Sequence, residues 1–102
     1  MKSDKEKRLK ALANGHRLLI MELLKAPTRN FPPQVDGDLE ADGVCAGKIE
    51  EKLGLAQPTT AQHLKALVDA GFLVPKRIKK WTFYKRDETA IGRFLSDLSG
   101  SV

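Results

Sequence analysis

The chain has 102 residues, which is the size of one domain with one modest hydrophobic core. Its 18 Lys and Arg residues exceed its 13 Asp and Glu residues, and the formal net charge of +5 favours an anionic partner, nucleic acid before a membrane surface. No apolar run approaches the roughly 20 residues of a membrane span, no signal-type apolar block follows the N-terminus, and the single Cys45 excludes an internal disulfide. We therefore expect one cytoplasmic domain, residues 1–102, that does not enter a membrane.

Two helices are predicted at the start of the chain. The stretch SDKE, which begins at Ser3, has the Ser-x-x-Glu form of a capping box, so a first helix should run from Ser3 to about Ala13. Asn14 can then cap a second, leucine-rich helix that ends before Pro27.

The segment from Pro27 to Gly43 is predicted to be one long loop, because it has three prolines, two glycines and no helical or strand pattern. Four acids stand at alternate positions in it: Asp36, Asp38, Glu40 and Asp42. The last three, followed by Gly43, have the spacing of the first half of a calcium-binding EF loop. The second half of such a loop is missing, since Ile49 stands where a bidentate Glu should complete the coordination. We therefore interpret this segment as solubilising acidic surface.

The stretch KIEEKLGLAQPTTAQHLKALVDAG, residues 48–71, predicts two helices joined by a tight turn. Gly54 suits the left-handed end of the first helix, and Pro58 is tolerated in the first turn of the second. This arrangement is the helix-turn-helix, whose second helix, here 57–70, presents its N-terminal end to the edges of bases.

The N-terminal turns of that second helix are polar. Its inward stripe should consist of Thr60, Leu64, Leu67 and Val68, which turns the other polar side chains outward. Gln can bond bidentately to adenine, Thr can contact bases, and His can reach phosphates. The candidate DNA-binding residues of this helix are Gln57, Thr59, Thr60, Gln62, His63 and Lys65.

A basic β-hairpin is predicted over residues 73–86. Residues 72–86 hold six bases and no acid, whereas residues 28–51 hold two bases and six acids. The bases alternate with Trp81, Phe83 and Tyr84, which favour strands, and a charge run this dense is less typical of a merely solvated face. The candidate DNA contacts in the hairpin are Lys76, Arg77, Lys79 and Lys80.

A last helix is predicted after Asp87, with apolar residues at i, i+3, i+4 and i+7. This stripe and the apolar side of the first helix would otherwise be exposed to solvent. Pairing the terminal helices of two subunits would bury both surfaces. The predicted dimer interface consists of Leu9, Leu12, Ile91, Phe94, Leu95 and Leu98. The alternative is that the last helix packs only on its own chain.

These elements predict a mainly α fold with a small β-hairpin (α+β), a winged helix-turn-helix of about five helices and a two-stranded wing. Residues 9–88 resemble the ArsR family of winged-helix repressors in three blocks: LKALANGHRLLIMELLK, IEEKLGLAQPTTAQHLKALVDAGFLV and KRIKKWTFYKRDE. The resemblance implies a cytoplasmic homodimer that represses transcription from a pseudo-palindromic operator until an inducer releases it.

The sequence departs from the metal-sensing members of the family. Where they carry Cys-Val-Cys, this chain has Cys45-Ala46-Gly47, and its last helix contains no histidine. We therefore expect no metal and no other cofactor, and we interpret Cys45 as a half-buried structural residue.

Two other function classes remain to be considered. A winged-helix module that binds a protein partner is the alternative, although it would not need six bases in its wing. An enzyme is not expected, because neither His16 nor His63 has a nucleophile and an orienting partner in the sequence. The sequence therefore predicts a dimeric regulator that binds double-stranded DNA.

Overall fold

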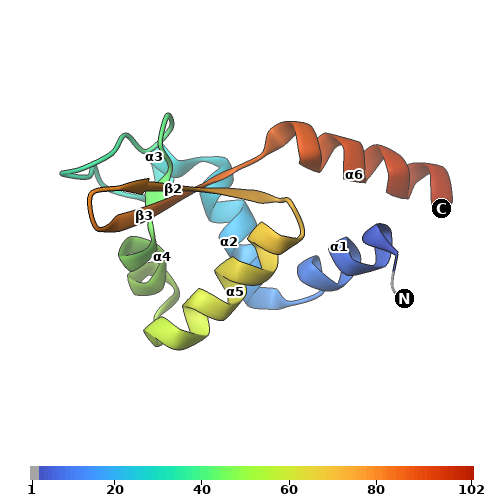
Figure 1. The fold of residues 1–102 in the computed structure, drawn as a ribbon, viewed down its shortest axis with the longest axis horizontal. Helices are drawn as coiled ribbons and strands as arrows, with labels where there is room; N and C mark the ends of the chain where they lie inside the picture. Colours follow the sequence, from blue (N-terminus) through green and yellow to red (C-terminus); the bar gives the residue numbers. More distant parts are fainter. Residues whose placement is uncertain (1–2) are drawn as a thin grey trace.

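The computed structural model describes residues 3–102. The elements in chain order are α1 (Asp4–Leu12), α2 (Gly15–Lys25), α3 (Pro27–Asn30), β1 (Val44–Cys45), α4 (Ala46–Leu53), α5 (Gln57–Asp69), β2 (Leu73–Ile78), β3 (Trp81–Arg86) and α6 (Glu88–Ser101). The hairpin of β2 and β3 projects at one end of an elongated molecule, and α1 and the C-terminal part of α6 lie at the other (Figure 1). Among the helices of residues 3–102, none combines the length and the apolar character needed to cross a bilayer.

The predicted helix ends are confirmed. The side chains of Ser3, Asn14 and Asp87 accept hydrogen bonds from backbone N–H groups in the first turns of α1, α2 and α6, respectively. Gly54 ends α4 with φ = 67°, in the left-handed region that glycine adopts without steric cost. Short polar side chains and glycine therefore set these boundaries locally.

Two elements were missed in the predicted loop and next to it. Residues Pro27–Asn30 form a single helical turn, because proline's fixed φ suits a first helical position, so the prediction of one continuous loop is wrong at its start. Val44 and Cys45 form β1, which pairs antiparallel with Tyr84 and Phe83 of β3. Residues 3–102 thus contain six helices and a three-stranded sheet of order β1-β3-β2, where about five helices and two strands were expected. A strand of two residues has no alternating pattern to detect.

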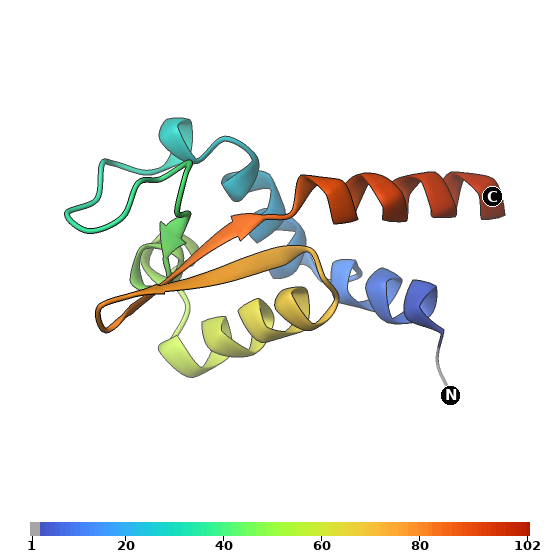
Figure 2. The same cartoon turned by 45° about the horizontal axis from the view of Figure 1, so that its top comes forward.

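One hydrophobic core joins the helices to the sheet. The predicted inward stripe of α5 is confirmed, since Leu64 and Leu67 are buried and Val68 packs against the core. They meet Ile20 of α2 and Ile49 of α4 in that core. The sheet contributes Val44 of β1 and Leu73 of β2, and α6 contributes Phe94. In the tilted view, α5 lies along one side of the hairpin (Figure 2). The core therefore fixes the position of α5 relative to the hairpin.

Candidate nucleic-acid interface

The exposed face of α5 is polar at its N-terminal end. Gln57, Thr59 and Gln62 are exposed, as predicted for base contacts. No side chain caps the N-terminus of α5 at Ala56, so the first N–H groups of the helix can serve an external acceptor. This end of the helix offers both side-chain and backbone donors.

Thr60 does not belong to that face. It is 2% exposed, and its hydroxyl donates to the Ala56 carbonyl at 3.1 Å. Its inclusion among the DNA-binding residues is therefore wrong. The helical period turns position 60 toward the core, where the hydroxyl needs a partner inside the protein.

His63 is half-buried between α5 and α2 and does not point freely outward. Nη1 of Arg17 donates to its Nδ1 at 3.3 Å, and its ring lies 5.4 Å from that of His16. Partial burial, followed by the positive charge of Arg17 and the neighbouring His16, holds the pKa of His63 below its ordinary value. A phosphate contact by a charged His63 is therefore disfavoured.

Arg17 is a residue that the sequence did not reveal. Besides His63, it binds the carbonyls of Ala11 (2.6 Å) and Lys10 (3.2 Å) at the end of α1. Its guanidinium thereby joins α1, α2 and α5, and it fixes the base of the candidate recognition helix. A contact between positions 17 and 63 leaves no signal in local sequence.

Lys65 is exposed on α5 but has a partner. Its Nζ pairs with Oδ2 of Asp69 at 2.7 Å, one helical turn later. The hydrogen bond from Lys65 lowers the pKa of the Asp69 carboxyl, which is therefore ionised at neutral pH. A phosphate would therefore have to compete with Asp69 for the ammonium group of Lys65.

The hairpin reaches its tip at Lys79 and Lys80. Ile78 pairs with Trp81, which leaves a two-residue turn in which Lys79 has φ = 56°. Nζ of Lys80 lies 5.0 Å from the centre of the Trp81 ring, and this indole is 44% exposed. Gln57 and Ala61 of α5 and Lys80 and Trp81 of the hairpin line one groove, whose lining also includes the start of α4 and Glu50. The recognition helix and the wing tip thus border a common surface.

The acidic loop, residues 31–43, packs on this basic hairpin. Lys79 pairs with Asp36 at 3.0 Å, Lys76 pairs with Asp42, and Nζ of Lys85 donates to the Ala41 carbonyl at 3.1 Å. The acids of the loop are therefore paired with the wing as well as exposed to solvent. Opposite charges that are 34 and 43 positions apart in sequence meet only through the fold.

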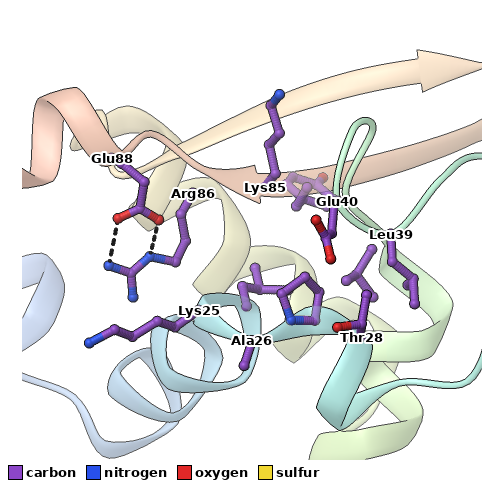
Figure 3. A pocket seen from close by; sticks show the side chains of 12 residues that line it. Lys25, Ala26, Thr28, Leu39, Glu40, Lys85, Arg86 and Glu88 are labelled. Carbon is purple, nitrogen blue, oxygen red and sulfur yellow. Dashed lines mark hydrogen bonds and ion pairs between the residues drawn. The ribbon is translucent and has the colours of Figure 1, made fainter.

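Arg86 belongs to the scaffold. Its guanidinium forms two hydrogen bonds with Glu88, at 2.9 and 3.1 Å, and donates to the Met21 carbonyl at 3.0 Å. Figure 3 shows this pair beside a pocket where α2, α3 and the end of β3 meet. Within residues 3–102, Arg77 and Lys80 are thus the bases of the hairpin without a carboxylate or loop partner.

The predicted dimer residues divide into three groups by exposure. Leu9 and Leu95 are exposed, at 40% and 55%, while Leu12, Ile91 and Leu98 are half-buried against the core of their own chain. Phe94 is 2% exposed and packs edge-to-face on Phe72, with ring centroids 5.2 Å apart. Its assignment to a subunit interface is therefore wrong, because this side of the α6 stripe faces inward. Leu18 and Leu19 of α2 are also exposed.

Cys45 is half-buried in β1, and its backbone N–H donates to Oε1 of Gln34 at 2.7 Å. Because this contact uses the backbone, Cys45→Ser should preserve the fold and leave DNA binding unchanged. Gel-shift titration under reducing and oxidising conditions checks this result. Oxidant-induced release from DNA that occurs in the native protein and not in the Ser variant would contradict it.

Comparisons with known proteins agree with this architecture. Residues 40–74 match the family described as "Bacterial regulatory protein, arsR family". The chain is 43% identical over 93 residues to the HTH-type transcriptional regulator YbzH of Bacillus subtilis, covering 91% of this chain and 93% of that protein. It is 27% identical over 99 residues to a biofilm growth-associated repressor of Xylella fastidiosa, with coverages of 95% and 78%.

Solved structures show the same fold. A homodimeric winged helix-turn-helix DNA-binding domain from Mycobacterium bovis, described as a possible ArsR-family regulator, superposes with a TM-score of 0.66 at 22% identity, covering 96% of this chain and 78% of that one. HlyU from Vibrio cholerae gives 0.64 at 25% identity, with coverages of 96% and 94%. The chain therefore belongs to the ArsR family of winged helix-turn-helix, DNA-binding transcriptional regulators.

Proposed function

We propose that this regulator is a cytoplasmic, homodimeric repressor in which residues 1–102 act as one DNA-binding and dimerisation domain. Each subunit places the N-terminal half of α5 in the major groove of a pseudo-palindromic operator and lays its hairpin on the adjacent backbone. The observation that carries this proposal is the groove bordered by Gln57 and Ala61 of α5 and by Lys80 and Trp81 of the wing. A groove between a polar helix end and a basic wing tip suits a sugar–phosphate strand that passes between the two elements.

The roles of the side chains follow from their positions. Gln62 is exposed on α5, within the first two turns, where a recognition helix reads bases. Lys80 stands at the wing tip, where it can neutralise a phosphate but reads no base. The homodimeric relative and the relative named as a repressor support the assembly and the direction of regulation.

Two substitutions separate base reading from phosphate binding. Gln62→Ala should lower discrimination between the operator and competitor DNA by about 1–3 kcal/mol, with little change in salt dependence. Lys80→Gln should weaken all duplexes alike and reduce the slope of log affinity against log salt by about 0.9. The preferred site is first selected from random duplexes, and fluorescence anisotropy then measures each variant over a range of salt.

The two variants serve as controls for each other. If Gln62→Ala leaves discrimination unchanged, Gln62 does not read the operator. Salt-insensitive binding, or no duplex binding by the native protein, would favour a winged-helix module that binds a protein partner instead.

A further inference from the structure

The carboxylates of the acidic loop are held in place by the loop itself. Oδ2 of Asp42 accepts from the Asp38 N–H at 2.7 Å, and Oδ2 of Asp38 accepts from the N–H groups of Glu40 (3.1 Å) and Ala41 (2.8 Å). These bonds fix the turn that aims Asp42 at Lys76. The turn of the acidic loop thus holds the Asp42 carboxylate of this ion pair in position.

The loop is also anchored to the body of the protein. Phe31 and Leu39 are 5% and 8% exposed. Gln34 bridges the loop ends, because its Nε2 donates to the Gly43 carbonyl at 3.0 Å and its Oε1 accepts from the Cys45 N–H. Gly43, at φ = 108°, lies so close to β3 that a Cβ atom would stand 2.4 Å from the Tyr84 carbonyl oxygen. Backbone contact with the sheet therefore keeps the acids beside the wing.

The two sides of each ion pair differ in freedom. The side chains of Lys76 and Lys79 are 54% and 71% exposed, whereas those of Asp42 and Asp36 are 18% and 28% exposed. Exposed ion pairs contribute little to stability, so the lysines can turn away at small cost. The hydrogen bond from the Asp38 N–H holds the Asp42 carboxylate in position, and both carboxylates compete with any other anion that approaches these lysines.

We propose that Asp36 and Asp42 are internal competitors for DNA phosphates, so that Lys79 and Lys76 bind the DNA backbone only by exchanging a loop carboxylate for a phosphate. This inference rests on the proposed function. It concerns the part of the DNA affinity that does not depend on base sequence. A lysine already neutralised by Asp36 or Asp42 adds little counterion release when it meets DNA. The loop thus lowers the affinity for duplexes of any sequence and leaves more of the binding to contacts with bases.

The test uses two double variants of the full chain that remove the same charge from the same loop. Asp36→Asn with Asp42→Asn removes the two carboxylates that pair with lysines, and the amide oxygen that the second substitution introduces can still accept the Asp38 N–H. Asp38→Asn with Glu40→Gln is the matched control: neither carboxylate contacts a lysine, and the amide oxygen introduced at position 38 can still accept from the Glu40 and Ala41 N–H groups, so the turn that orients Asp42 is kept. Affinity for a random-sequence duplex is measured by fluorescence anisotropy between about 50 and about 200 mM salt.

The first double variant should bind the duplex more tightly at low salt and depend more steeply on salt. Two additional phosphate contacts correspond to about 1.8 units of slope, so its affinity should fall about tenfold more than that of the native protein across this range. The control should keep the native slope. The proposal would be overturned if the two double variants had the same slope, whether or not that slope differed from the native one.

A measurement without DNA keeps this result separate from the proposed function. The hydrogen bond from Lys76, followed by that from the Asp38 N–H, holds the pKa of Asp42 below its ordinary value. NMR titration of the carboxyl carbon should show that low pKa in the native protein and a higher pKa in Lys76→Gln. An unchanged Asp42 pKa would refute the ion pair, whereas failure of the native protein to bind any duplex would refute the proposed function.

Discussion

Leu95→Asp should convert the dimer to monomers that keep their helix content but bind the operator about 10²- to 10⁴-fold more weakly. Leu95 is 55% exposed on α6, and Leu9 of α1 is 40% exposed. In the proposed dimer these side chains are buried against a second copy, so a carboxylate at position 95 would lose its hydration without gaining a partner. A monomer contacts only one half-site of the operator. It therefore loses the gain in affinity that a dimer obtains when its two linked domains bind both half-sites.

Sedimentation velocity and operator titration measure the two parts of this expectation. Ser96→Asp is the control, because it adds the same charge at an exposed position one residue on, away from the apolar stripe of α6. It should remain dimeric and bind the operator as the native protein does. A native protein that sediments as a monomer at micromolar concentration would refute the dimer.

Phe94→Ala should lower the free energy of unfolding by about 3–5 kcal/mol. The ring is 2% exposed and meets the Phe72 ring at an interplanar angle of 75°, the edge-to-face contact that aromatic pairs favour. Truncation removes this contact and leaves a cavity between α6 and the start of β2. Urea denaturation followed by circular dichroism, at several protein concentrations, measures the loss.

The neighbouring positions provide the comparison for this prediction. Ser96→Ala, on the exposed side of α6, should stay within about 0.5 kcal/mol of the native protein. If Phe94→Ala instead kept its stability and sedimented as a monomer, the ring would belong to the subunit interface, as the sequence pattern suggested. Phe94 and Leu95 are adjacent in sequence, so together they locate the line where the core ends and the proposed dimer surface begins.

Much of the fold could be predicted because its signals are local. Side-chain oxygens of Ser3, Asn14 and Asp87 bind N–H groups in the first turns of their own helices, and Gly54 adopts a conformation that other residues avoid. The helix-turn-helix and its inward stripe follow from the helical period. The sequence by itself therefore determined the order of the main elements and the polar end of α5.

Only the tertiary structure decided which polar and apolar residues are available to a partner. Periodicity identifies a stripe on α6, but the packing of Phe72 determines that Phe94 lies inside and Leu95 outside. The ion pairs of the acidic loop with the wing, and the link between Arg17 and His63, join positions 34 to 46 residues apart. Charges so distant in sequence meet because buried apolar residues bring their elements together, and the electrostatics of the DNA-binding surface follow from that packing.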